Sequence, residues 1–213
     1  MNFDGIILDI DGTIWNTTSV VAKAWNRAIE NNFPQVPRVT ADILKGQFGK
    51  PMNVIADNLF TGLDDDQKKI LMRACEKEEE KEISQNETNI TYEGVAETIE
   101  KLSKKIPLFI VSNCQKGYIE LVMKKNNITN CITDFESYGN TGKQKWENIV
   151  LIENRNNLKH PVYVGDTQGD FDSCMKAGID FIFASYGFGK INENDQKKVY
   201  KTIKNFPELL FLV

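Results

Sequence analysis

The sequence predicts an α/β fold, in which a doubly wound parallel sheet forms the core and a small α-helical segment is inserted into it. Three apolar runs, at residues 6–8, 106–111 and 161–164, break abruptly into polar residues, as buried strands do where they leave a sheet. Helical patterns separate these runs, and a last apolar run at 181–184 completes the expected sheet. Such alternation of strands and helices is typical of a parallel sheet with helices on both faces.

The first apolar run ends in two carboxylates, Asp9 and Asp11, followed by Gly12 and Thr13. Alternation along a strand points both aspartates the same way, so their repulsion requires a cation, a shared proton or both. Ligands of open α/β sheets collect outside the carboxyl ends of the strands. We therefore expect a reactive site here, against the plainer alternative of a strand followed by a glycine turn.

A second acidic signal follows the run at 161–164. Asp166 comes directly after the expected strand, and Asp170 lies four residues on, at the start of a helical pattern. Both can face one pocket together with Asp9 and Asp11. Oxygen ligands with room for waters and a substrate phosphate suit Mg²⁺ better than Ca²⁺ or Zn²⁺.

Donor side chains follow the run at 106–111. Ser112 and Asn113 come at once, and Gln115 extends the set. A hydroxyl, an amide and a helix N-terminus are groups that hold a phosphoryl oxygen. Taken alone, Ser112 and Asn113 are also plausible as the N-cap of the helix that follows.

A turn-rich loop at residues 139–145 carries Lys143 and Lys145 and leads into an amphipathic helix. One fixed ammonium near the carboxylates would balance charge during phosphoryl transfer, whereas the other lysine can be solvated. Lys143 precedes the expected first helical turn. Because a loop residue reaches a strand-end carboxylate more freely, we expect Lys143 rather than Lys145 to pair with Asp9.

In this order, these motifs resemble those of the haloacid dehalogenase (HAD) superfamily, and the similarity is greatest to the phosphoglycolate phosphatase-like branch with a helical cap. The resemblance implies a Rossmann-like core, with Asp9 as the nucleophile that forms an aspartyl-phosphate and Asp11 as the general acid and base. It also implies Mg²⁺ on Asp9, Asp166 and the Asp11 backbone carbonyl, with Asp170 supporting the metal site.

The same resemblance implies residues that bind the phosphoryl group, and we expect these to be Gly12, Thr13, Ser112, Asn113 and Gln115. Two departures from the branch stand out. Lys143-Gln144-Lys145 replaces the usual Lys-Pro pair, and Trp15-Asn16-Thr17 replaces an Asp-Ser pair near the cap hinge.

The resulting expectation is a Mg²⁺-dependent phosphatase that hydrolyses a small phosphorylated metabolite. Asp11 favours phosphate esters, because a carboxylic acid can protonate the leaving alkoxide and then, ionised, accept a proton from water. A phosphomutase would use the same residues and stays an alternative. A phospho-acceptor domain without enzyme activity is less favoured, since it needs neither a cap nor an acid two residues after the nucleophile.

Residues 15–89 lack a convincing buried strand, so we expect a helical cap there and a core domain of residues 1–14 and 90–213. Trp25 belongs to a cap helix by its spacing, and Lys50, in a turn after the next helix, is a candidate substrate contact or a solvated lysine. The charged run at 76–82 is expected to be a solvated helix face without function.

Composition and charge limit the classes of partner that we expect the protein to bind. A net charge of −4 without a basic stripe predicts no nucleic-acid binding, and no apolar run is long enough to predict a membrane span. The four cysteines lack the spacing of a metal site and do not indicate secretion, and no leader pattern is recognisable. We therefore expect reduced thiols and a cytoplasmic location. We expect a monomer or a weak homodimer.

Overall fold

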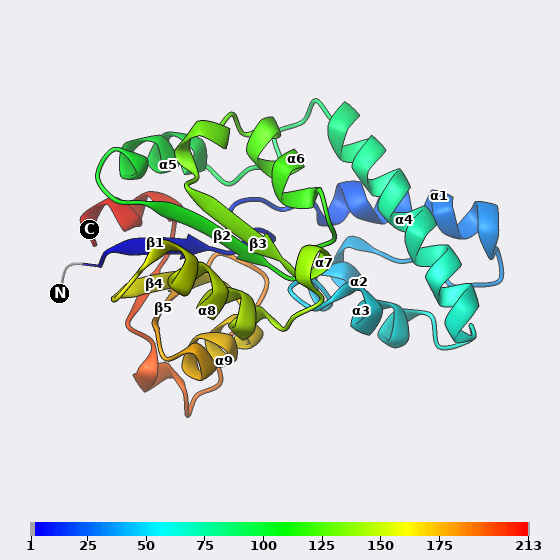
Figure 1. Cartoon of the computed structure of the whole chain (residues 1–213). Coiled ribbons are helices and arrows are strands. Elements are labelled where there is room, and N and C mark those ends of the chain that lie inside the picture. Colours follow the sequence, from blue (N-terminus) through cyan, green and yellow to red (C-terminus); the bar gives the residue numbers. More distant parts are fainter. Residues whose placement is uncertain (1–2, 213) are drawn as a thin grey trace.

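The computed structural model describes residues 3–212 and contains a six-stranded parallel sheet in the order β3-β2-β1-β4-β5-β6 (Figure 1). The strands are β1 (Gly5–Leu8), β2 (Leu108–Ser112), β3 (Asp134–Ser137), β4 (Pro161–Gly165), β5 (Asp180–Ala184) and β6 (Lys201–Ile203). Each neighbouring pair is parallel. The central strand β1 is buried throughout, as expected for a strand covered on both faces.

The four strands predicted from apolar runs are confirmed as β1, β2, β4 and β5, but the expectation that 181–184 is the last strand is wrong. β6 follows it at one edge of the sheet, and β3, which was not predicted, forms the other edge. Both edge strands are short and carry charged residues. Edge strands need only one buried face and avoid aggregation through such charges, so they give no apolar run to detect.

Helices cover both faces of the sheet, which confirms the doubly wound arrangement. One face packs against α5 (Val95–Ser103), α6 (Tyr118–Lys125) and the 3₁₀ helix η3 (Phe206–Phe211). The other face packs against α8 (Lys145–Asn156) and α9 (Gln168–Ala177). The short elements that remain outside the cap are η1 (Thr129–Cys131), α7 (Tyr138–Thr141) and η2 (Gln196–Lys198).

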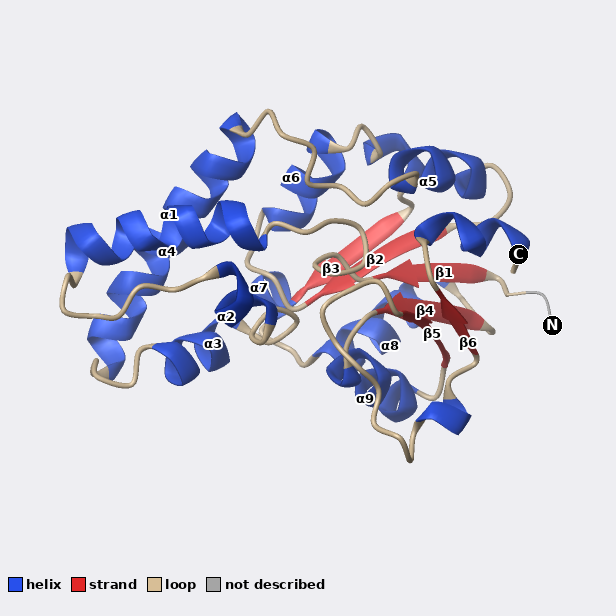
Figure 2. Cartoon of the chain, turned by 180° about the vertical axis from the view of Figure 1, so that it is seen from behind, coloured by secondary structure: helices blue, strands red, loops and turns tan. Residues whose placement is uncertain are grey.

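Four helices gather beyond one end of the sheet, and we call residues 15–89 the cap (Figures 1 and 2). These helices are α1 (Thr18–Asn32), α2 (Ala41–Lys45), α3 (Met52–Leu59) and α4 (Asp65–Gln85). The two connections to the core run side by side, because the Asn16 amide donates to the Ile90 carbonyl and the Tyr92 amide donates to the Ile14 carbonyl. The cap is thus attached through one paired hinge.

Residues without a site role also have defined places. His160 is exposed before β4, and its backbone amide donates to Asp4. All four cysteines are free thiols. Within residues 3–212, every helix falls short of the length and hydrophobicity that crossing a lipid bilayer requires.

Truncation of the sheet core should destabilise the protein strongly. Ile110 lies in the middle of β2 with no exposed surface, so Ile110→Ala should lower the free energy of unfolding by about 2–5 kcal/mol through lost burial and an unfilled cavity. Ile70 on α4 is 53% exposed, and Ile70→Ala should change it by less than about 0.5 kcal/mol. Urea unfolding measures both; equal losses would contradict this account of the core.

Candidate active site

Three strands deliver polar residues to one edge of the sheet. Asp9 follows β1, Ser112 ends β2 and Asp166 follows β4. Because β1 lies between β2 and β4 and all three are parallel, their carboxyl ends are adjacent. The Asp9, Ser112 and Asp166 side chains are buried there, so the predicted convergence of distant segments is confirmed.

A buried lysine links the acidic residues. The Lys145 Nζ donates to Asp9 Oδ1 at 2.9 Å and to Asp170 Oδ1 at 2.5 Å, and Lys145 itself is only 3% exposed. Burial opposes its charge, but the carboxylates of Asp170 and Asp9 outweigh burial and raise the pKa of Lys145 above its ordinary value. The ammonium therefore stays charged and fixes one oxygen of each carboxylate.

The expectation that Lys143 pairs with Asp9 is wrong. Lys143 is exposed, and its backbone amide donates to Thr141 Oγ1, whereas Lys145 is the first residue of α8. Side chains on a helix lean toward its N-terminus. The N-terminus of α8 lies at the edge of the sheet where the strands end, so this orientation directs the Lys145 side chain into the site. Lys143, in the preceding loop, is not held in this way and lies in solvent.

The oxygens of Asp9, Asp166 and Asp170 lie within 4.8 Å of one another, and all three residues are buried. Asp9 Oδ2 and Asp166 Oδ1 are buried without a hydrogen-bond partner. Buried carboxylate oxygens rarely lack a partner, and hard oxygen ligands are those that Mg²⁺ prefers. The donor set therefore fits a magnesium ion, with Asp9 and Asp166 providing free oxygens.

Asp170 contributes differently. Its Oδ2 accepts hydrogen bonds from the backbone amides of Asp166 and Thr167 and from Thr167 Oγ1, while its Oδ1 accepts from Lys145. With both oxygens already in use, Asp170 orients Lys145 and the loop of Asp166. This geometry agrees with the supporting role expected for it.

Two glycines allow the chain to approach Asp166 closely. Gly12 has a φ of +86°, and a Cβ at that residue would lie 2.1 Å from Asp166 Oδ2. A Cβ at Gly187 would lie 2.3 Å from the Asp166 Cβ. Any side chain at either position would displace this carboxylate, so Gly12 shapes the acidic cluster itself.

The acidic cluster has unusual electrostatics. Burial raises the pKa of Asp9 and Asp166 well above their usual range, and the neighbouring carboxylate of Asp170 adds to the effect. Lys145 offsets only part of it. The protein alone does not compensate the negative charge gathered here, which is the condition under which a divalent cation binds.

Three hydrogen bonds hold Asp11 in place through one oxygen of its carboxylate. Its Oδ1 accepts hydrogen bonds from Trp15 Nε1 at 3.1 Å, Thr17 Oγ1 at 3.1 Å and Tyr118 OH at 2.9 Å. Burial raises the pKa of Asp11 to about 6, while these hydrogen bonds pull it down. Such a pKa suits a group that gives and takes a proton near neutral pH.

Trp15 and Thr17, where the sequence departs from the phosphoglycolate phosphatase-like pattern, therefore contact Asp11 as well as forming part of the hinge. Tyr118 was missed as a site residue, since its place in an apolar helix pattern indicates only core packing. No sequence signal separates a core tyrosine from one whose hydroxyl reaches a carboxylate.

The predicted phosphate binders differ in what they offer. Thr13 Oγ1 is buried without a partner and can donate to a phosphoryl oxygen. Ser112 lies at the same edge. The Asn113 and Gln115 amide nitrogens, in contrast, donate to Gly49 O and Glu79 Oε1 in the cap. These two amides thus join core and cap in this structure rather than face the phosphate position.

A small cavity of about 30 Å³ lies between core and cap above Asp11. Lys50 lines it, and its Nζ donates to Gly46 O and Gln47 Oε1. The lysine is therefore at the cavity wall but engaged within its own turn. Its predicted contact with substrate stays a prediction.

The expectation that residues 76–82 form a solvated helix face is wrong at Glu79, which is 4% exposed and lines this cavity. Glu79 Oε2 accepts from Trp25 Nε1 at 2.7 Å, and burial raises the pKa of Glu79 to about 7. The neighbouring Glu82 pairs with α1 through Lys23 and Arg27. Packing of α4 on α1 thus buries one carboxylate in a charged run.

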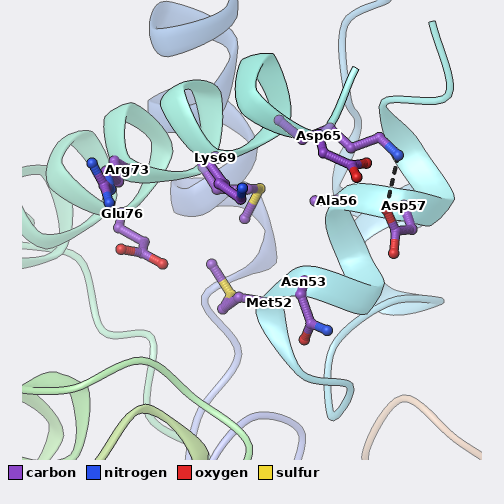
Figure 3. A pocket seen from close by; sticks show the side chains of 10 residues that line it. Met52, Asn53, Ala56, Asp57, Asp65, Lys69, Arg73 and Glu76 are labelled. Carbon is purple, nitrogen blue, oxygen red and sulfur yellow. Dashed lines mark hydrogen bonds and ion pairs between the residues drawn. The ribbon is translucent and has the colours of Figure 1, made fainter. Parts of the chain in front are cut away.

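A second cavity, of about 450 Å³, lies within the cap between α3 and α4. Figure 3 shows Met52 from α3 opposite Glu76 from α4 across it. Met52 also lines the smaller cavity, but no strand-end residue reaches the larger one. Its walls contain none of the acidic cluster.

Comparison with crystal structures shows the same fold along whole chains. A predicted phosphoglycolate phosphatase from Haemophilus somnus 129PT is 20% identical, with a TM-score of 0.85 and coverage of 99% of this chain and 97% of that one. A haloacid dehalogenase-like hydrolase family protein from Streptococcus pneumoniae is 19% identical, with a TM-score of 0.83 and coverage of 99% and 98%.

A predicted phosphatase from Clostridium acetobutylicum is 15% identical, with a TM-score of 0.83 and complete coverage of both chains. Comparison with the sequences of curated proteins finds no match. The family model for haloacid dehalogenase-like hydrolases matches residues 6–184, which include every strand-end motif described above. The chain therefore belongs to the haloacid dehalogenase-like hydrolase family.

Proposed function

We propose that the protein is a Mg²⁺-dependent phosphatase of the phosphoglycolate phosphatase-like branch, which hydrolyses a small phosphorylated metabolite through an aspartyl-phosphate. The observation that carries this proposal is the set of unpartnered oxygens. Among residues 3–212, the buried side-chain oxygens without a hydrogen-bond partner are those of Asp9, Thr13, Asn113 and Asp166, and all four lie at this site. A cation would satisfy the carboxylate oxygens of Asp9 and Asp166, and a phosphoryl oxygen would accept from the Thr13 hydroxyl.

In the first half-reaction, Asp9 attacks the phosphorus atom. Lys145 donates to Asp9 Oδ1 and Oδ2 has no partner, so one oxygen of this carboxylate can form the new bond while the other stays available to a cation. As that bond forms, the bond between phosphorus and the ester oxygen breaks, and Asp11 gives its proton to the leaving oxygen. The products of this step are an alcohol and an aspartyl-phosphate at Asp9.

In the second half-reaction, the ionised Asp11 accepts a proton from water as the water oxygen bonds to phosphorus. The bond from phosphorus to the Asp9 carboxylate oxygen breaks, which releases phosphate and restores both carboxyl groups. Thr17, Trp15 and Tyr118 keep Asp11 in place for both steps by holding one of its oxygens.

A bound Mg²⁺ would supply charge neutralisation for the phosphoryl group and the Asp9 carboxylate. Asp9 and Asp166 would hold it, with the Asp11 backbone carbonyl as the further ligand that the family resemblance implies. Lys145 stabilises negative charge from the opposite side through Asp9 and Asp170. Thr13 can donate to a phosphoryl oxygen, because its hydroxyl is free.

The cap must move during turnover. A cavity of about 30 Å³ holds about two waters, at the roughly 10–15 Å³ that each needs, and a phosphate ester is larger. Contacts between cap and core include the hydrogen bonds from Asn113 to Gly49 and from Gln115 to Glu79, an edge contact of the Phe48 and Phe188 rings at 6.1 Å, and hydrogen bonds from Lys125 Nζ to the Ser84 and Asn86 carbonyls. Opening at the hinge would break the contacts beside the cavity and admit substrate.

The proposed function predicts phosphate release that depends on both Mg²⁺ and Asp9. Released phosphate should be measurable with a panel of small phosphate esters, and chelation by EDTA should abolish it. Asp9→Asn should abolish turnover, because an amide cannot form the aspartyl-phosphate, while circular dichroism shows an intact fold. Near wild-type phosphate release by Asp9→Asn would refute the assignment of Asp9 as the nucleophile. Transfer of the phosphoryl group to a second hydroxyl would indicate a phosphomutase.

Asp11→Asn should slow both half-reactions, since one carboxyl group serves as acid and then as base. The turnover number should fall by about two to four orders of magnitude, the usual contribution of a positioned acid or base. Mg²⁺ affinity should change little, because the proposed ligand is the backbone carbonyl. Single-turnover kinetics and calorimetric Mg²⁺ titration test the two points; unchanged chemistry with lost Mg²⁺ affinity would overturn the assignment.

Lys145→Met should lower the turnover number by about two to three orders of magnitude, the range measured when one charge-stabilising donor is removed from an active site. The matched variant Lys143→Met removes an exposed lysine two residues earlier and should leave the turnover number near wild type. Both are compared at saturating Mg²⁺ after thermal melting confirms folding. A larger loss in Lys143→Met would reverse the placement of the two lysines.

A further inference from the structure

Glu79 is a buried carboxylate at the cavity where a leaving group would lie, and none of the catalytic steps above uses it. It enters from the cap, on α4, while Asp11 enters from the core, and both line the same cavity. Once phosphate is bound at the strand-end edge, the remainder of a substrate must extend toward the cap. Glu79 is therefore placed to contact the part of the substrate that differs between phosphate esters.

The partners of Glu79 are neutral. Its two oxygens accept hydrogen bonds from the Trp25 indole and from the Gln115 amide, at 2.7 and 2.9 Å. A buried carboxylate is costly unless a cation or several donors compensate it. Trp25 and Gln115 bring donors but no positive charge, so the negative charge of the ionised Glu79 carboxylate has no cation beside it and is open to a donor that enters the cavity.

The cavity wall also offers a second free acceptor. Asn113 donates its amide nitrogen to the Gly49 carbonyl, which fixes the orientation of the side chain and leaves Oδ1 buried without a partner. Among the lining residues that the structure describes, the sole cation is Lys50, and its ammonium already donates to Gly46 and Gln47. The wall is thus rich in acceptors and poor in free donors.

We propose that Glu79 selects phosphate esters whose leaving group carries a hydroxyl or ammonium donor and disfavours those whose leaving group carries a carboxylate. This inference rests on the proposed phosphatase function and specifies its substrate class. A donor-bearing leaving group would satisfy the Glu79 carboxylate and the Asn113 oxygen. A carboxylate would instead lie beside Glu79 and Asp11, where like charges repel strongly because little water screens them.

The test compares kcat/KM for three small esters at pH 8 with saturating Mg²⁺: ethanolamine phosphate, glycerol 1-phosphate and phosphoglycolate. The first two separate an ammonium from hydroxyl donors, and the third carries a carboxylate. The wild-type protein should prefer at least one donor-bearing ester to phosphoglycolate by about tenfold or more, given the strength of close charge repulsion in a shielded site. A preference for phosphoglycolate would overturn the inference without any variant.

Glu79→Gln should lower this preference by about tenfold, chiefly through a lower KM for phosphoglycolate, because it removes the charge and keeps the shape. Glu79→Asp retains the charge and should retain the discrimination. Glu82→Gln is the matched control: it removes a carboxylate on the same helix that pairs with Lys23 and Arg27 outside the cavity, and it should leave the preference unchanged. An unchanged preference in Glu79→Gln would overturn the role of Glu79.

Acetyl phosphate separates failure of this inference from failure of the proposed function. It is small and carries neither a donor nor a charge beyond its phosphoryl group. Hydrolysis of acetyl phosphate without discrimination among the three esters would overturn the inference alone. Absence of Mg²⁺-dependent hydrolysis of all four compounds would overturn the phosphatase function and the inference with it.

Discussion

The buried ion cluster of Lys145 with Asp9 and Asp170 is the interaction on which the architecture of the site depends. It joins the end of β1 to the first turn of α8, 136 residues further along the chain, and to the first turn of α9, another 25 residues on. Taking three charges out of water is expensive, and it succeeds only where geometry and further hydrogen bonds compensate. Here the amides of Asp166 and Thr167 and the Thr167 hydroxyl complete the set around Asp170.

Core and cap contribute different groups to the site. The core fixes the reacting groups on strand ends and helix starts, which are rigid, and it leaves free the oxygens that phosphate and metal require. The cap contributes Glu79 and the turn at Gly49, which lie on the opposite wall. In the proposed function, the core therefore supplies the reacting groups and the cap supplies the residue that selects among substrates.

The sequence predicts those parts of the site whose position depends only on neighbouring residues in the chain. Asp9, Asp11 and Asp166 follow apolar runs directly, so their position at a strand end can be inferred without the fold. Lys145 could not be assigned, because its direction depends on the residue at which α8 begins. Glu79 is invisible within a charged run, because only the packing of α4 against α1 buries it. The edge strands β3 and β6 lack the apolar pattern that marks their neighbours.

The hydrogen bonds of the indole rings have a practical consequence. Trp15 donates to Asp11, the proposed general acid, and Trp25 donates to Glu79 on the cap side of the cavity. Two of the three tryptophans of the protein therefore contact groups that the proposed mechanism would charge or bring to a ligand. We expect tryptophan emission of the native protein to report the proposed cap movement in a stopped-flow instrument, without any attached dye.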